Sequence, residues 1–308
     1  ACIASPSSLV LFDNSTLSVT RHVKNCHDSV TAIAAANQHV ATAGRDGLVK
    51  LWDDRSKDVN ATLVLQGDGK GLSAVAVSEH LVAAGTENTR DGPGDVSVLV
   101  WDIRSPTSTL RSYADSHNDT ITTLGFHPSD HSMLLSSSTD ALLTLFNTSV
   151  ADEDDAVTQV FNNAAAVHCA SFLAADEVGA ISSDEQMSIY QRSRPEDIER
   201  DDVVAVETRY GDVRTELNAS YVVDLIRTSS AADAETWVVG GDLESRSITI
   251  TPLVRQLAAG PTKWMFEHRR AVTFPGGHGE EIVRDVLLLP DHRVLTCGED
   301  GTVRMWTV

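Results

Sequence analysis

One short pattern recurs along this sequence: an acidic tight turn, an alternating apolar run, and an aromatic residue near its end. The stretch GRDGLVKLWDDRS runs from Gly44 to Ser56, GPGDVSVLVWDIRS ends at Ser105, and CGEDGTVRMWTV closes at Val308. The aromatic landmarks are Phe12, Trp52, Trp101, Phe146, Tyr190 and Trp306, with a degenerate copy near Ile248–Thr251. Such a repeat constrains the fold more than any single residue does, because each copy must form the same small unit.

The repeat has the length of a four-stranded blade. Its landmarks lie roughly 40 to 60 residues apart, which is the period of propeller blades. Each copy contains short runs rich in Val, Ile, Leu and Thr, such as SVTAIAAA, HVATAG and LVKLWD, bounded by turn-forming residues. Such runs predict strands, and no long window carries the apolar stripe of an amphipathic helix. We therefore expect an all-β chain, a seven-bladed β-propeller of four-stranded antiparallel blades.

Composition favours a globular protein of a reducing compartment. Of the 308 residues, 42% are hydrophobic and 22% are charged, which is ordinary for a globular domain. No apolar run approaches the ~20 residues of a membrane helix. The four cysteines lie far apart without a C-x-x-C pair, which argues against a zinc site and against a disulfide scaffold. We expect an intracellular protein, in the nucleus, the cytoplasm or both, without membrane contact.

The net charge of −20 bears on the choice of partner. Binding of nucleic acid rests on Lys and Arg side chains that neutralise phosphates, so we expect no direct nucleic-acid ligand. An acidic surface suits basic protein partners, and it also keeps a protein soluble. The charge alone leaves both interpretations open.

Four polar positions within the repeat resemble those of WD-repeat β-propellers. In that family a His before the innermost strand, a Ser or Thr in the second strand, an Asp in the next turn and a Trp in the third strand hydrogen-bond together. The last copy carries all four, as His278, Thr296, Asp300 and Trp306. The resemblance implies that these residues are structural and that Trp306 is a buried anchor.

Two other copies match this set in part. One has His117, Ser136 and Asp140, but Phe146 stands in place of the Trp and cannot donate an indole hydrogen bond. The other has Thr42, Asp46 and Trp52, with His27 one residue out of register. We expect both sets to be structural as well.

A closer resemblance covers most of the chain. Two stretches are similar to blades of the WD repeat-containing protein 89 family. One is HNDTITTLGFHPSDHSMLLSSSTDALLTLFNTSVADEDDA, and the other is AAGTE followed by VLVWDIR. The degenerate copy, GDVRTELNASYVVDLI followed by WVVGG, is the more specific marker because generic WD repeats lack it. The resemblance implies no defined biochemical activity. Members of that family can carry a basic tail, and the sequence up to Val308 shows none.

No residue pattern points to catalysis or to a cofactor. The run GDGKGLS has the wrong spacing for a phosphate loop and lies between two predicted strands. His127 and His131 flank a Pro-containing turn, which we interpret as solvent-exposed and not as a metal site. His168 and Cys169 are adjacent on a strand, so their side chains face opposite sides and cannot form a nucleophile–base pair. We expect a non-catalytic protein without a cofactor.

Candidate partner-binding residues therefore lie on loops. Arg55 and Arg104 each follow a Trp-Asp pair by two residues. This W-D-x-R pattern resembles the motif by which some propellers dock onto the DNA-damage-binding adaptor of cullin-4 ubiquitin ligases. The alternative is that each Arg merely pairs with a neighbouring Asp. Asp212 and Arg214 stand where other copies place Gly-His, which indicates either a binding role or a rewired blade.

Two acidic runs are the remaining candidates. One is Asp152, Glu153, Asp154 and Asp155, and the other extends from Glu196 to Asp202. Such runs are either solvated loops or landing sites for a Lys-rich or Arg-rich tail.

Together these patterns predict a single β-propeller domain over residues 1–308, acting as a monomeric protein–protein interaction scaffold. Two specialised versions compete: a substrate receptor of a cullin-4 ligase, and an acidic carrier for basic proteins such as ribosomal proteins or histones. The first residues, ACIAS, read as the second strand of a blade whose inner strand is missing. We therefore expect roughly 30 to 40 further residues upstream of Ala1, about one blade's length less two strands.

Overall fold

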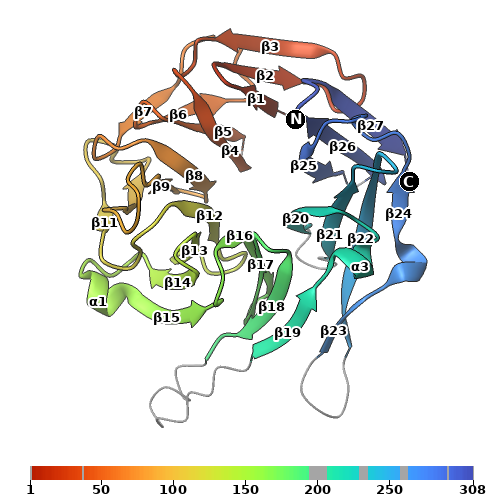
Figure 1. Ribbon diagram of the computed structural model, residues 1–308. Coiled ribbons are helices and arrows are strands. Elements are labelled where there is room, and N and C mark those ends of the chain that lie inside the picture. The colour runs from red at the N-terminus through yellow and green to blue at the C-terminus, as the bar shows by residue number, and fades with distance from the viewer. Residues whose placement is uncertain are drawn as a thin grey trace. The chain divides into compact units, whose positions relative to one another are not determined.

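The computed structural model describes residues 2–36, 38–193, 207–228, 235–256, 263–289 and 291–307. These residues form two compact units: the first comprises the described residues up to 170 together with 192–193, and the second comprises 171–191 and the described residues from 207 onward. Antiparallel strands dominate both units (Figure 1). The prediction of a single domain over residues 1–308 stays a prediction.

The first unit contains four sheets that follow one another along the chain (Figure 1). The first sheet consists of β1 (Cys2–Ser5), β2 (Ser8–Phe12) and β3 (Val19–Lys24). The second has β4 (Val30–Ala36), β5 (His39–Gly44), β6 (Leu48–Asp53) and β7 (Leu63–Gln66). The third has β8 (Leu72–Val77), β9 (Leu81–Thr86), β10 (Val98–Asp102) and β11 (Arg111–Tyr113). The fourth has β12 (Ile121–Phe126), β13 (Met133–Ser138), β14 (Leu142–Asn147) and β15 (Val157–Asn162).

The second unit begins within the first strand of the fifth sheet. That sheet comprises β16 (Val167–Ala174), β17 (Glu177–Ser182), β18 (Gln186–Gln191) and β19 (Glu207–Asp212). The sixth has β20 (Tyr221–Arg227), β21 (Thr236–Asp242), β22 (Ser247–Gln256) and β23 (Lys263–Phe266), with β24 (Val272–Phe274) also paired to β22. The last has β25 (Val283–Leu288), β26 (Arg293–Gly298) and β27 (Val303–Thr307).

The all-β propeller class with four-stranded antiparallel blades is confirmed. The expected count of seven complete blades is not reached among the described residues, because five sheets have four strands or more and two have three. The degenerate copy near Ile248–Thr251 lies within β22. The helices among the described residues are short: α1 (Glu153–Ala156), α3 (Arg214–Leu217) and the 3-10 helix η1 (His268–Arg270). Of the residues described, no helix is both long and apolar enough to cross a bilayer.

Local chemistry explains why the repeat folds as it does. The acidic turn between the second and third strands of a sheet needs a residue with positive φ, and Gly47 (φ 75°) and Gly301 (φ 70°) supply it. The second strand is buried on both faces, as in β5, where every residue after the first is buried. The outer strand β3 alternates between buried and exposed residues over its second half. β5 is therefore an apolar strand covered on both faces, and β3 is an amphipathic one.

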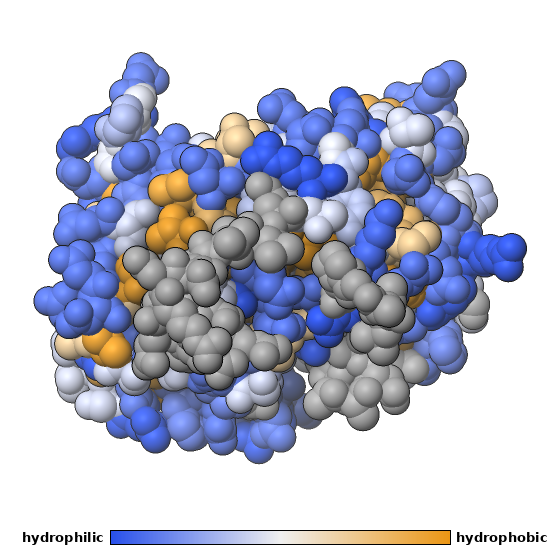
Figure 2. Space-filling view, turned by 90° about the horizontal axis from the view of Figure 1, so that it is seen from below, coloured by the Kyte–Doolittle hydropathy of each residue, from blue (hydrophilic) through white to orange (hydrophobic). Residues whose placement is uncertain are grey.

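Small and large apolar residues fill the space between neighbouring sheets. Ala41 and Ala43 of β5 pack in one buried cluster with Leu99 and Trp101 of β10. The small alanine side chains leave space for the large indole of Trp101. The surface seen from below in Figure 2 is mostly hydrophilic, with hydrophobic residues in small patches between polar ones. That distribution is normal for a globular protein with a closed core.

Candidate functional site

The second sheet carries a complete chain of polar side chains. Trp52 Nε1 donates to Thr42 Oγ1 at 3.0 Å, Thr42 Oγ1 lies 2.8 Å from His27 Nε2, and His27 Nδ1 lies 2.9 Å from Asp46 Oδ1. An imidazole protonated on Nδ1 satisfies every contact, since the indole and hydroxyl then donate toward the ring and the ring donates to the carboxylate. His27 thus belongs to the network although the sequence placed it one residue out of register.

The last sheet repeats this geometry, and the fourth does so in part. His278 lies 2.8 Å from both Asp300 Oδ1 and Thr296 Oγ1, and Trp306 Nε1 donates to Thr296 at 2.9 Å. In the fourth sheet, His117 lies 3.0 Å from Asp140 Oδ2 and 2.7 Å from Ser136 Oγ. Phe146 occupies the place of the Trp there, and its ring stacks on Tyr113 at 4.6 Å between ring centroids.

The expectation that Trp306 is deeply buried is wrong. Trp306 is partly exposed, whereas Trp52 is only 2% exposed. Among the described residues, β27 pairs with β26 alone, whereas the indole of Trp52 packs in a buried cluster with Leu9, Leu11 and Val23 of the first sheet. Trp306 packs instead against Phe274, with ring centroids 5.1 Å apart.

The two complete networks each require a glycine beside the histidine. A Cβ atom on Gly44 would lie 2.5 Å from His27 Nδ1, and a Cβ atom on Gly298 would lie 2.6 Å from His278 Cγ. Real Cβ atoms do not approach other heavy atoms so closely, so any side chain at either position would displace the ring. The glycine two residues before the turn aspartate is therefore part of the network.

Arg55 and Arg104 adopt one shared geometry. Arg55 donates through Nε and Nη2 to Asp53, at 3.1 and 2.9 Å, and Arg104 donates through the same atoms to Asp102, at 2.9 and 2.6 Å. The hydrogen bonds from the arginines lower the pKa of Asp53 and that of Asp102 to about 2. Both arginine side chains remain about two-thirds exposed, at 66% and 63%. Each guanidinium is held in place by its neighbour and still faces solvent.

Arg104 also borders a pocket of about 290 Å³ in the first unit, together with His80, Leu110 and His131. Leu110 is 39% exposed there, an apolar side chain among polar ones. This W-D-x-R arginine therefore lies beside a concavity.

Asp212 and Arg214 form the same kind of pair. Arg214 Nε and Nη2 lie 3.0 and 2.6 Å from the two carboxylate oxygens of Asp212. Between them Val213 is fully buried, and Leu217 at the end of α3 is 1% exposed. The segment that replaces the usual Gly-His is thus anchored by apolar residues and presents the ion pair at the surface.

The first acidic run is divided between internal and external roles. The carboxylate of Glu153 accepts hydrogen bonds from the N–H groups of Ala114, Asp115 and Ser116, at 2.7, 3.0 and 2.8 Å. Asp152 caps α1 by accepting from the N–H of Asp154 at 3.1 Å. Asp152, Asp154 and Asp155 are exposed, and Glu153 is only partly so. The second run, Glu196–Asp202, lies outside the described residues.

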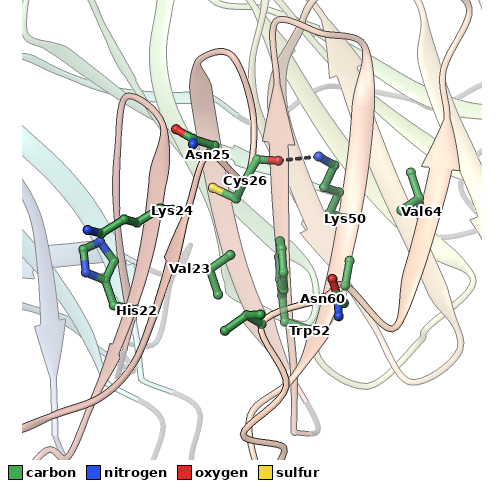
Figure 3. Close-up of a pocket in the computed structure, with 11 residues that line it drawn as sticks. His22, Val23, Lys24, Asn25, Cys26, Lys50, Trp52, Asn60 and Val64 are labelled. Atoms are coloured by element: carbon green, nitrogen blue, oxygen red, sulfur yellow. Dashed lines mark hydrogen bonds between the residues drawn. The ribbon is translucent and has the colours of Figure 1, made fainter.

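A groove that the sequence did not reveal opens between β3 and the β6–β7 pair (Figure 3). Its volume is about 750 Å³. One wall consists of residues 22–26, on β3 and the turn that follows it. The other consists of Lys50 and Trp52 on β6, residues 59–61, and Val64 on β7. Alternation along β3 is visible in the sequence, but only the fold shows which segment faces it.

Comparison with known proteins identifies the family. The description "WD domain, G-beta repeat" matches residues 18–53 and 269–307. The chain is 30% identical over 273 residues to an uncharacterized WD repeat-containing protein of Schizosaccharomyces pombe, covering 84% of this chain and 80% of that protein. The chain belongs to the family of WD-repeat proteins. The two matched ranges contain the two complete networks, those of His27 and His278, so the family signature coincides with the observed hydrogen bonds.

Other relatives of this WD-repeat protein agree. It is 31% identical over 271 residues to an uncharacterized WD repeat-containing protein of Saccharomyces cerevisiae, spanning 64% of that protein's length. It is 25% identical over 150 residues to the WD repeat-containing protein 89 homolog of Dictyostelium discoideum, which covers 49% of this chain and 38% of that protein. The protein 89 resemblance is therefore found at low identity over half of the chain.

Solved structures support the fold of this WD-repeat protein. A chain in the crystal structure of the mitotic checkpoint complex matches with a TM-score of 0.71 and 15% identity, covering 100% of this chain and 83% of that one. The computationally designed Ika8 protein matches with a TM-score of 0.67 and 17% identity, covering 99% and 92%. At such identities the likeness concerns architecture alone.

The residues tested for catalysis occupy turns and strands of this WD-repeat protein. The run GDGKGLS connects β7 to β8, and its Lys70 pairs with Asp68 at 3.2 Å. His168 is exposed and Cys169 is buried, as expected for opposite faces of a strand. Within the described ranges, no group of three or more His, Cys, Asp or Glu side chains is placed to hold a metal ion.

The interpretation of the His127–His131 turn as solvent-exposed is wrong for one of the two residues. His131 is exposed, but His127 is only 3% exposed. Its Nδ1 accepts the N–H groups of Ser129 and Asp130, at 3.2 and 3.0 Å. The imidazole of His127 is buried because it accepts the backbone hydrogen bonds that hold the turn together.

Proposed function

We propose that this WD-repeat protein is a non-catalytic scaffold that binds other proteins through the loops and grooves of its blades. The observation that carries the proposal is the division of its polar side chains between buried hydrogen-bond networks and fixed ion pairs at the surface. The buried His and Thr residues of the two complete networks hydrogen-bond to each other, and the arginines that follow β6 and β10 stay at the surface in fixed pairs with Asp. A rigid frame with preorganised polar groups at its surface binds partners at a lower entropic cost.

The scaffold proposal is tested by affinity purification of the full chain followed by mass spectrometry. We expect a reproducible set of partner proteins that is reduced by substitutions on one surface and unaffected by matched substitutions elsewhere. Recovery of no protein above the level of a tag-only control would contradict the proposal.

A substrate-receptor role in a cullin-4 ligase is the more specialised candidate. It is supported by the exposure of Arg55 and Arg104 and by the same pairing of each with the Asp that ends β6 or β10. It would require that each guanidinium use its remaining Nη1 edge for the adaptor, since Nε and Nη2 already bond to the neighbouring Asp.

The double variant Arg55→Ala/Arg104→Ala should abolish binding to the adaptor, while its melting temperature stays close to wild type because exposed ion pairs contribute little to stability. The variant with Lys at both positions should bind weakly, because an ammonium cannot make the paired hydrogen bonds. Pull-down with the purified adaptor and a thermal melt on the same samples measure both effects. A folded double-Ala variant that still binds would exclude this candidate, as would a wild type that never binds.

A role as an acidic carrier for basic proteins is supported by the net charge of −20 and by the exposed carboxylates of the first acidic run. The triple variant Asp152→Asn/Asp154→Asn/Asp155→Asn should weaken capture of a Lys-rich tail peptide at low salt. The difference should shrink near physiological ionic strength, where charges are screened beyond about 8 Å.

Glu153→Ala is the matched control for that triple variant. It should instead destabilise the fold by about 1–3 kcal/mol, because three N–H groups lose a charged acceptor. Peptide binding and urea unfolding separate the two effects. If the triple variant and wild type capture the peptide equally at low salt, the acidic run is a solvated loop and not a binding site for basic tails.

A further inference from the structure

We infer that the groove between β3 and the β6–β7 pair binds an extended acidic segment of a partner protein. This inference rests on the proposed scaffold function and names one of its binding surfaces. The volume of about 750 Å³ lies within the range of roughly 300–1,000 Å³ that is usual for ligand sites.

The charge of the groove is opposite to that of the chain. Lys50 points from β6 toward β3, and none of the lining residues is Asp or Glu, whereas the side chains of His22 and Lys24 extend from the face of β3 opposite to Val23 (Figure 3). Although Asp and Glu outnumber Lys and Arg by 44 to 24, these three side chains form no ion pair with a carboxylate in the described part of the chain. Lys50 donates one hydrogen bond, to the carbonyl of Cys26 (Figure 3), and an ammonium has three donors. A basic groove on an acidic protein selects an acidic occupant.

A buried arginine adds to this charge from behind the wall. Arg21, on the same face of β3 as Val23, is 7% exposed. Its Nη1 donates to the carbonyls of Ser56 and Asp58, at 2.8 and 3.1 Å, so it fastens the segment that leads to residues 59–61. Its Nε and Nη2 have no hydrogen-bond partner among the described residues. The wall is therefore preformed and carries an uncompensated positive charge.

The groove also offers apolar contacts. Val59 and Val64 are 57% and 50% exposed, and both line it. Burying such aliphatic side chains contributes roughly 25 cal/mol per Å² of apolar area. An extended occupant whose groove-facing side chains, at every second position, include both aliphatic and acidic ones would cover these valines and reach Lys50 at the same time.

The shape of the wall favours an extended occupant. Among the described residues, β3 is an edge strand that pairs with β2 alone. The outer side of such a strand presents unpaired N–H and C=O groups, and an extended peptide can pair with them while alternate side chains enter the groove. A segment that carries acidic and aliphatic residues in turn at every second position, and so on one face of a strand, therefore matches this wall.

A single-stranded nucleic acid fits less well. Proteins that bind it stack bases on exposed aromatic side chains. The one aromatic residue lining the groove is Trp52, which is 2% exposed and bonded to Thr42. The peptide is therefore the occupant that the chemistry favours.

The inference is tested with a fluorescein-labelled peptide of about ten residues in which Glu and Val take turns at every second position and Thr fills the positions between them, measured by anisotropy against the full chain at low salt. We expect saturable binding, weakened several-fold in Lys50→Gln because an ion pair is lost. Lys263→Gln, which removes the same charge elsewhere, should bind like wild type, as should Lys24→Gln, whose side chain lies on the other face of β3. A peptide with Gln in place of each Glu should bind more weakly to wild type. Hydrogen exchange should show added protection of Val19–Lys24 in the complex.

Several results would overturn the inference: no saturable binding to wild type, equal binding by the groove variant and its charge-matched control, or preference for an oligothymidylate over the peptide. A melt of each variant confirms that it is folded. If affinity purification with the groove variant recovers every partner of wild type, the groove is not the binding surface and the scaffold proposal stands. If wild type recovers no partner, the scaffold proposal itself fails.

Discussion

Replacing Trp52 with alanine should lower the free energy of unfolding by about 3–5 kcal/mol, the usual range for a buried Trp. The side chain is 2% exposed and packs in one cluster with Leu9, Leu11 and Val40, which joins the first two sheets. Its removal leaves a cavity between them and takes a donor from Thr42. The midpoint of urea unfolding, followed by far-UV circular dichroism, measures the loss.

Trp52→Phe is the control that separates packing from hydrogen bonding. Phenylalanine keeps most of the apolar contact but loses the indole N–H, so this variant should lose about 0.5–1.5 kcal/mol for the hydrogen bond and a further part for volume. Trp306→Ala should cost less than Trp52→Ala, because Trp306 is partly exposed. Wild-type stability in Trp52→Ala would mean that the second sheet is not held as described.

Asp140→Ala should also cost about 3–5 kcal/mol near neutral pH, as when one partner of a buried polar pair is removed. The carboxylate is 3% exposed, and it accepts from His117 and from the N–H groups of Asn118 and Leu142, at 3.0, 3.0 and 2.9 Å. Burial raises the pKa of Asp140, but these hydrogen bonds outweigh it, so the pKa lies below its usual value. Alanine leaves three donors without an acceptor.

The effect of Asp140→Ala should depend on pH in a defined direction. A carboxyl group with a lowered folded-state pKa contributes its full stability above the unfolded pKa of about 4 and loses it as pH falls through the folded pKa. The difference in urea midpoint between wild type and Asp140→Ala should therefore be large at pH 7 and shrink below about pH 4. Asp140→Asn, which keeps the shape and one acceptor, should lose less at pH 7. A difference that does not change with pH would contradict the ionised carboxylate.

The fold class followed from the sequence because its cause is local. The turn before Trp52 and the turn before Trp306 each place a positive-φ glycine between two short apolar strands, and that chemistry is written in consecutive residues. The sequence did not predict that His27 belongs to the polar network of the second sheet. His27, His117 and His278 lie different distances ahead of strands that begin at Val30, Ile121 and Val283. The loop absorbs the difference in length, and the ring position is set by the hydroxyl and carboxylate that bind it.

The surface features were harder to predict because their partners are distant in sequence. The roles of Arg55 and Arg104 were visible as two alternatives, and each arginine does bond its neighbouring Asp. In the sequence, Glu153 is indistinguishable from the three acidic residues beside it. No neighbouring residue indicates that Ala114–Ser116 would donate three N–H groups to its carboxylate. The groove needs β3 and β7 to face each other, and strand patterns alone do not determine which segments meet.

The unequal copies of the polar network have a consequence for how the chain reaches its structure. Repeat proteins fail characteristically when a strand from one copy pairs within another. Here the second and last sheets require His, Thr, Asp and Trp together, the fourth requires a Phe that stacks on Tyr113, and the third has Ala84 where the second has Thr42. A strand exchanged between these sheets would leave a buried donor or acceptor unmatched, at about 1–3 kcal/mol for each group. The differences among the copies therefore favour pairing of each strand within its own sheet over pairing with a strand of another sheet.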